Sequence, residues 1–148
     1  MQALGFNGPW DMSIVERPDP VAGDDQVVIE VIATGICGSD VHGYSGETGR
    51  RTEGQVMGHE MVGRVAGGSD QFAPGTLVTV NPILSCGHCE FCLEGETQVC
   101  TESVVIGVEP TLDGSFAELI VMPARNVIPL GENVPVLHGA FVEPLAVG

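Results

Sequence analysis

Four short hydrophobic runs lie along the chain, each bounded by residues typical of turns. They are rich in Val and Ile, and they cover residues 27–36, 58–66, 76–80 and 114–123. Segments rich in Gly, Pro and Asp, such as 18–25 and 67–75, separate them. No amphipathic helix longer than about three turns is evident before Val136. The pattern predicts a mainly β fold, a small barrel or sandwich with short helices.

The last stretch, residues 134–148, is apolar and is typical of the start of a helix, but it has no polar face and no capping segment. We therefore expect this sequence to be cut from a longer protein. The chain of 148 residues has the size of one domain and contains no internal repeat or low-complexity linker. We expect residues 1–148 to form a single folded unit.

Acidic residues dominate the charge, with 20 Asp and Glu against five Arg and no Lys, for a formal net charge of -15. Such a surface repels phosphate backbones and anionic lipids, so we expect no nucleic-acid or membrane partner. No apolar run approaches the roughly 20 residues that a bilayer requires. The N-terminus lacks a basic segment followed by an apolar one, so a secretory signal is not expected. We expect a reducing, cytoplasmic location.

Four of the five cysteines fall within residues 85–101. Cys86, Cys89, Cys92 and Cys100 follow the spacing C-x2-C-x2-C-x7-C, which lets a loop place four thiolates tetrahedrally around zinc. A site closed by four sulfurs does no Lewis-acid chemistry, so we expect a structural zinc that holds this lobe together.

Three other interpretations of the four cysteines are weaker. Disulfides are disfavoured by the expected reducing compartment and by the odd total of five cysteines. An iron–sulfur cluster fits less well, because the ferredoxin run has a last gap of three and a following proline. Ordinary buried thiols are the remaining alternative. His88 lies within the cluster, but four cysteines complete a tetrahedron without it, so we expect a solvent-facing turn residue.

A second candidate metal site involves the fifth cysteine. Cys37 ends one hydrophobic run, and His59 and Glu60 begin the next. Taken singly, a buried Cys or a hydrogen-bonded structural His is the commoner explanation. Together, one Cys, one His and one Glu supply the three protein ligands of a catalytic zinc that keeps its fourth position open.

The chain resembles the zinc-dependent medium-chain alcohol dehydrogenases over its whole length. The motifs are Cys-Gly-Ser-Asp at 37–40, Gly-His-Glu at 58–60, the four-cysteine lobe, Asp-Gly-Ser-Phe-Ala-Glu at 113–118 and Phe-Val-Glu-Pro-Leu-Ala at 141–146. The branch of sorbitol, threonine and butanediol dehydrogenases is the most similar. The resemblance implies a GroES-like catalytic domain that binds two zinc ions. It makes Cys37, His59 and Glu60 ligands of the catalytic zinc, with Glu143 as an exchanging or water-bridged fourth.

The same resemblance implies roles for three residues beside the zinc. Asp40 would accept a hydrogen bond from His59, and Ser39 and His42 would relay a proton outward through the nucleotide ribose. A zinc alkoxide of a secondary alcohol, polyol or hydroxy amino acid would then transfer hydride to NAD or NADP. Without the resemblance, Ser39 and Asp40 are better explained as caps of a short helix.

Departures from the family concern mainly the region beyond residue 148. The family continues into a Rossmann domain, and this chain contains no G-x-G spacing, so the nucleotide would be held mainly by that missing partner. We expect the chain alone to bind zinc with little dehydrogenase activity, and the apolar segment 134–147 could support a homo-oligomer. Arg50 and Arg51 are expected to form a solvated turn, or else to meet an anionic substrate group.

A different class of function is also consistent with the sequence. A stand-alone GroES-like scaffold or assembly module would need only the closed four-cysteine site. The enzyme interpretation requires in addition an open metal at Cys37, His59 and Glu60.

Overall fold

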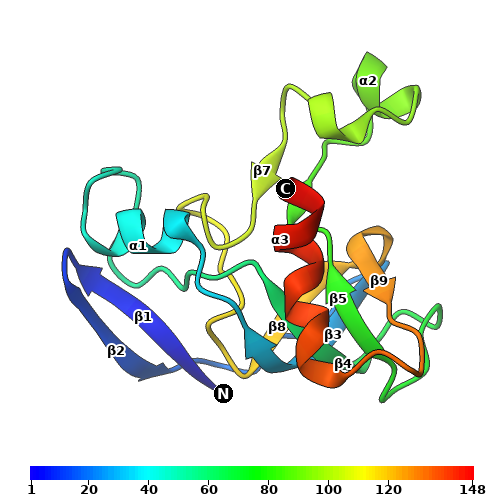
Figure 1. Cartoon of the computed structure of the whole chain (residues 1–148), viewed down its shortest axis with the longest axis horizontal. Coiled ribbons are helices and arrows are strands. Elements are labelled where there is room, and N and C mark those ends of the chain that lie inside the picture. The colour runs from blue at the N-terminus through cyan, green and yellow to red at the C-terminus, as the bar shows by residue number, and fades with distance from the viewer.

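The structure is a computed structural model that describes residues 1–148 (Figure 1). The strands are β1 (Gln2–Gly8), β2 (Asp11–Glu16), β3 (Gln26–Thr34), β4 (Met61–Gly68), β5 (Leu77–Val80), β6 (Ile83–Leu84), β7 (Val104–Val105), β8 (Leu119–Pro123) and β9 (Val127–Pro129). The α-helices are α1 (Gly38–Tyr44), α2 (Glu90–Leu93) and α3 (Val142–Val147), and the 3-10 helices are η1 (Thr97–Val99), η2 (Ala124–Asn126) and η3 (Val136–Phe141). The prediction of a mainly β fold with short helices is confirmed.

A five-stranded antiparallel sheet in the order β8-β3-β4-β5-β9 forms the centre of the molecule. Four of its strands, β3, β4, β5 and β8, come from the four hydrophobic runs, because β-branched side chains pack well on a pleated surface. The edge strand β9 lies outside those runs. Ile29 on β3 lies opposite Ile120 on β8 and Val65 on β4. Side chains alternate along β3, so that Ile29 is fully buried and Glu30 is exposed.

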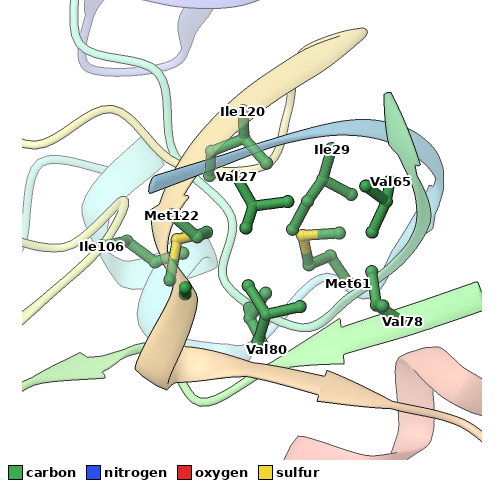
Figure 2. Close-up of a cluster of buried hydrophobic side chains, with 11 residues drawn as sticks. Val27, Ile29, Met61, Val65, Val78, Val80, Ile106, Ile120 and Met122 are labelled. Carbon is green, nitrogen blue, oxygen red and sulfur yellow. The ribbon is translucent and has the colours of Figure 1, made fainter. Parts of the chain in front are cut away.

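The hydrophobic core lies against this sheet (Figure 2). Burial of each large aliphatic side chain contributes about 1.5–3 kcal/mol, so this cluster is the main source of stability. Its eleven buried members are Val27, Ile29, Met61, Val65, Val78, Val80, Ile106, Ile120, Met122, Ala124 and Val127.

The N-terminal hairpin of β1 and β2 was not expected from the sequence. Its strands pair around a turn in which Trp10 has a positive φ of 65°. Most side chains of β2 are exposed, so the segment lacks the hydrophobic pattern of a buried strand.

The four-cysteine lobe projects from the sheet, whereas the C-terminal helix η3 packs against β3, β4 and β5. Figure 1 shows α2 and its loop standing away from the body, above the short pair β6 and β7. The segment 134–148 is helical as expected, although it begins as the 3-10 helix η3 before α3. None of the helices has the length and apolarity needed to cross a bilayer.

Candidate active site and metal centres

The register of β3 against β4 brings Cys37 to His59 and Glu60. The ladder between these strands ends at Thr34 opposite Met61, and the N–H of Gly35 donates to the Glu60 carbonyl over 2.6 Å. The chain then places Cys37 three residues beyond β3, while His59 and Glu60 directly precede β4. Two segments distant in sequence thus meet at one end of the sheet.

The side chains of Cys37, His59 and Glu60 form a compact donor set. Their ligand atoms all lie within 4.8 Å of one another, which is close enough for one metal ion to bind all three. His59 is 5% exposed and Glu60 9%, while Cys37 is half-buried. Buried charged groups are normally paired or bound to metal, and this set of Cys, His and carboxylate suits zinc.

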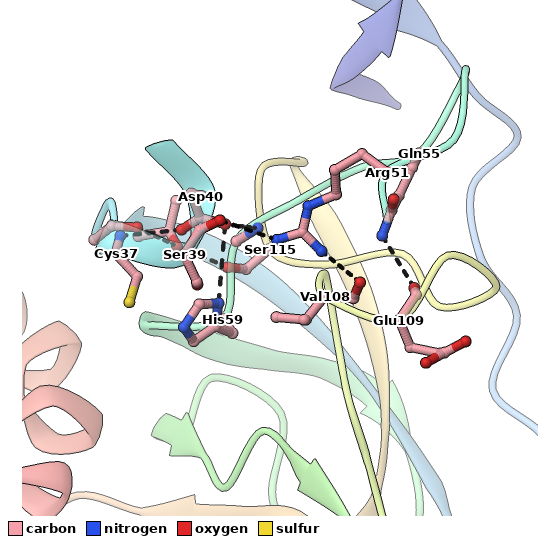
Figure 3. A network of polar contacts seen from close by, with 12 residues as sticks. Cys37, Ser39, Asp40, Arg51, Gln55, His59, Val108, Glu109 and Ser115 are labelled. Atoms are coloured by element: carbon pink, nitrogen blue, oxygen red, sulfur yellow. Dashed lines mark hydrogen bonds and ion pairs between the residues drawn. The ribbon is translucent and has the colours of Figure 1, made fainter. Parts of the chain in front are cut away.

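Asp40 is buried beside this donor set (Figure 3). Its carboxylate accepts the N–H of Cys37 over 3.0 Å, which caps α1, and the N–H of Gly58 over 3.3 Å. It faces His59, but Oδ1 and the His59 Nδ1 are 4.0 Å apart, too far for a hydrogen bond. The expected Asp40–His59 hydrogen bond is therefore not formed, and the buried His59 Nδ1 has no hydrogen-bond partner.

The two residues of the expected proton relay lie on α1 in different environments. Ser39 does not cap the helix, since its Oγ is buried and has no hydrogen-bond partner. The side chain of His42 is 61% exposed, and its Nδ1 lies 2.6 Å from the Glu47 carboxylate. A buried hydroxyl and an exposed imidazole are thus three residues apart on one helix.

Glu143 on α3 faces the same region but is not part of the compact donor set. Burial raises the pKa of Glu143, Glu60 raises it further, and His59 acts in the opposite direction. A cleft of about 540 Å³ opens between the C-terminal helices η3 and α3 and the donor set, and its lining includes Cys37, Glu60, Leu137 and Phe141. Cys37 and Glu60 of the donor set thus face this cleft.

The four cysteines of the lobe form a second donor set, with all sulfur atoms within 4.8 Å of one another. Cys86 and Cys92 are 3.8 Å apart, and Cys89 and Cys100 are 3.9 Å apart, measured between sulfurs. A tetrahedron with zinc–sulfur bonds of about 2.3 Å has edges of about 3.8 Å. The spacing therefore fits zinc. His88 is exposed, as expected.

Backbone N–H groups point at two of these sulfurs. The N–H of Cys86 donates to Cys100 over 3.3 Å, and the N–H of Cys89 donates to Cys86 over the same distance. Donation to sulfur favours the thiolate, so the Cys86 N–H lowers the pKa of Cys100 to about 7, while the backbone of His88 lowers that of Cys86. Burial raises the pKa of Cys92 to about 11. Metal binding requires deprotonated ligands, and the lowered pKa values of Cys86 and Cys100 favour deprotonation of these two thiols.

Arg51 corrects one sequence-based expectation. Arg50 is exposed, as a solvated turn requires, but Arg51 is half-buried and donates to the carbonyls of Ser39 and Val108. Burial lowers the pKa of Arg51, and Asp40 acts in the opposite direction. The pattern of the sequence does not distinguish the two arginines, because their environments depend on the fold of distant segments.

Comparison with known proteins identifies the family. The family model described as "Alcohol dehydrogenase GroES-like domain" matches residues 23–132, and the chain belongs to this family. It is 37% identical over 149 residues to the zinc-type alcohol dehydrogenase-like protein YdjJ of Escherichia coli K12, covering 95% of this chain and 42% of YdjJ. It is 35% identical over 154 residues to sorbitol dehydrogenase of Bacillus subtilis 168, covering all of this chain and 43% of that enzyme.

A solved structure agrees with this assignment. RspB of Escherichia coli CFT073, an alcohol dehydrogenase complexed with NADH, superposes with a TM-score of 0.88 and 35% identity, covering 99% of this chain and 43% of RspB. The resemblance to the zinc-dependent alcohol dehydrogenases and the GroES-like fold are confirmed. This chain spans less than half the length of these relatives.

Proposed function

We propose that residues 1–148 are the catalytic domain of an NAD(P)-dependent zinc alcohol dehydrogenase that oxidises a secondary alcohol or polyol. The domain would bind two zinc ions, one structural in the lobe 85–101 and one catalytic at Cys37, His59 and Glu60. The compact buried donor set beside an open cleft is the observation that carries this proposal. A scaffold would need only the lobe.

The catalytic metal would have three protein ligands and space for a fourth. A zinc ion bound there supplies Lewis acidity, which lowers the pKa of a coordinated hydroxyl from about 16 toward 7. Glu143 would approach as an exchanging fourth ligand, and the apolar side chains of Leu137 and Phe141 would hold the carbon part of the alcohol. Cys37, His59 and Glu60 would hold this zinc ion at the N-terminal end of α1, the helix that carries Ser39.

Proton removal would start at Ser39, whose buried Oγ has no competing partner. The proton would leave through His42, whose side chain is exposed to solvent and contacts Glu47. Asp40 would hold the end of α1 against Gly58 and so fix the direction in which Cys37 points.

The nucleotide would be bound mainly by the part of the relatives that this chain does not span. NADH is bound to RspB, and hydride transfer requires such a cofactor. Exposed apolar side chains of the C-terminal helix, including Leu145 and Val147, would contact that second domain. We therefore expect the 148-residue chain alone to have little dehydrogenase activity.

The test uses cobalt as a spectroscopic probe. The chain is loaded with Co²⁺ and titrated with sorbitol and with imidazole, and the visible absorption bands are compared with those of Cys37→Ser. An open site predicts bands that are absent in Cys37→Ser and that shift on addition of either ligand. Bands of the four-cysteine site alone, unchanged by either ligand, would favour the scaffold.

A further inference from the structure

Arg51 connects two segments that support the proposed catalytic site. It lies in the coil between α1 and β4, and it donates from Nη2 to the Ser39 carbonyl over 3.3 Å and from Nη1 to the Val108 carbonyl. Figure 3 shows its guanidinium between Ser39 and Val108. The planar fork of Arg donates in two fixed directions, which Lys cannot reproduce.

The segment beyond Val108 is itself held against the Gly-His-Glu motif. Val56, Met57 and Gly58 accept N–H groups from Gly114, Phe116 and Ser115 over 2.8–2.9 Å. Gln55 reinforces this pairing by donating to the Glu109 carbonyl over 3.0 Å. Arg51 therefore links α1 to a segment that is already attached to the stretch of chain carrying His59.

Helix α1 has a gap that accommodates this side chain. Gly43 is buried, and a Cβ at this position would collide with the Nε of Arg51. Glycine costs about 1 kcal/mol relative to alanine inside a helix, so its presence needs a reason. Space for the guanidinium explains the glycine, because both Nη atoms of Arg51 are hydrogen-bonded and the side chain cannot move aside freely.

We propose that Arg51 is a positioning residue that fixes α1 relative to His59 and Glu60, so that Cys37 meets them at metal-binding distance. Helix α1 has only seven residues and buries only Asp40 and Gly43, so it depends on such contacts. The positive charge of Arg51 also lies near the buried carboxylate of Asp40, which orients the Cys37 backbone. This role rests on the proposed catalytic zinc site.

The test measures Co²⁺ affinity at the Cys37 site by competition with a chelator, with the four-cysteine bands as an internal measure of metal loading and far-UV circular dichroism as the measure of folding. Arg51→Met is expected to lower the Co²⁺ affinity of the Cys37 site about 10-fold or more, the usual effect of losing a residue that orients metal ligands. The affinity of the four-cysteine site should not change. Arg51→Lys should bind with intermediate affinity, and Arg50→Met, which removes the neighbouring exposed charge, should bind like the wild type.

Gly43→Ala provides a second, independent variant. It should favour helix formation yet weaken the Cys37 site, and this effect should disappear when Arg51 is already Met. Equal Co²⁺ affinities of Arg51→Met and Arg50→Met would overturn the proposed role of Arg51 but leave the proposed function intact. A wild type without Co²⁺ bands that depend on Cys37 would overturn both the proposed function and the role of Arg51.

Discussion

Asp40 shows how one side chain organises the proposed active site. Its carboxylate is 2% exposed and joins the backbone of Cys37 to that of Gly58, which precedes His59. These two N–H groups come from segments that carry different members of the proposed donor set. Asp40 thus couples the geometry of the donor set to the start of α1.

Asp40→Asn is expected to weaken both folding and metal binding. The amide keeps the shape but loses one acceptor, which leaves a buried N–H unsatisfied and lowers the free energy of unfolding by about 1–3 kcal/mol. Zinc affinity at the Cys37 site should fall about 10- to 100-fold. Urea unfolding and chelator competition measure the two effects. Asp70→Asn, at an exposed position, is the control, and equal behaviour of the two variants would contradict this account.

At the residue scale, the sequence predicted the members of the site better than their contacts. Cys37, His59 and Glu60 could be grouped because zinc chemistry requires those residue types together. The contacts of Asp40 and Arg51 could not be predicted from the sequence, because each side chain bonds to backbone groups of segments distant in the chain. A side chain that binds backbone carbonyls leaves no mark on the sequence pattern.

At the element scale, the lobe 85–101 lacks a core of its own. The helices α2 and η1 bury no side chain, and Cys100 is the buried residue of the segment. Hydrogen bonds to sulfur and the proposed zinc would therefore stabilise the lobe in place of apolar contacts.

Metal removal should therefore unfold the lobe and spare the sheet. Chelation is expected to increase amide hydrogen exchange throughout residues 85–101, while β3 and β4 remain protected. Exchange followed by mass spectrometry provides the measurement. Cys37→Ser with its lobe still loaded is the control, and its lobe should remain protected. A lobe that stays protected after chelation would show that zinc does not hold it.

Gly114 packs closely against the backbone around Gly58, where two segments of the chain meet. A Cβ at Gly114 would collide with the carbonyl oxygens of Met57 and Gly58, and backbone cannot move aside cheaply. Gly114→Ala should lower the free energy of unfolding by about 2 kcal/mol or more. Gly67→Ala, where a Cβ meets nothing within 4 Å, is the matched control in chemical denaturation. Equal stability of both variants would refute the close packing.

The elements found from the sequence were those with buried, β-branched runs. All four expected runs contribute strands to the central sheet. The hairpin of β1 and β2 was missed because its second strand is largely exposed, and its pairing depends on register with β1 rather than on burial.

At the scale of the whole molecule, charge opposes folding. The net charge of -15 concentrates repulsion on a small surface, and Asp24, Asp25 and Asp70 line one open hollow. Raising NaCl from about 0.01 M to about 1 M shortens the screening length from about 30 Å to about 3 Å.

Salt should accordingly stabilise the protein. We expect Tm to rise by about 3 °C or more over this range, equivalent to about 1 kcal/mol. Calorimetry measures the shift, and neutralising Asp24, Asp25 and Asp70 to Asn should reduce it. A Tm that is flat or falls with salt would contradict this prediction.

The most direct test of the central claim is the zinc content per chain of the wild type and of Cys37→Ser, determined by elemental analysis on folded protein. The proposed function predicts about two zinc ions in the wild type and about one in Cys37→Ser, because the four-cysteine site is unaffected. About one zinc ion in both proteins would contradict the catalytic site at Cys37, His59 and Glu60.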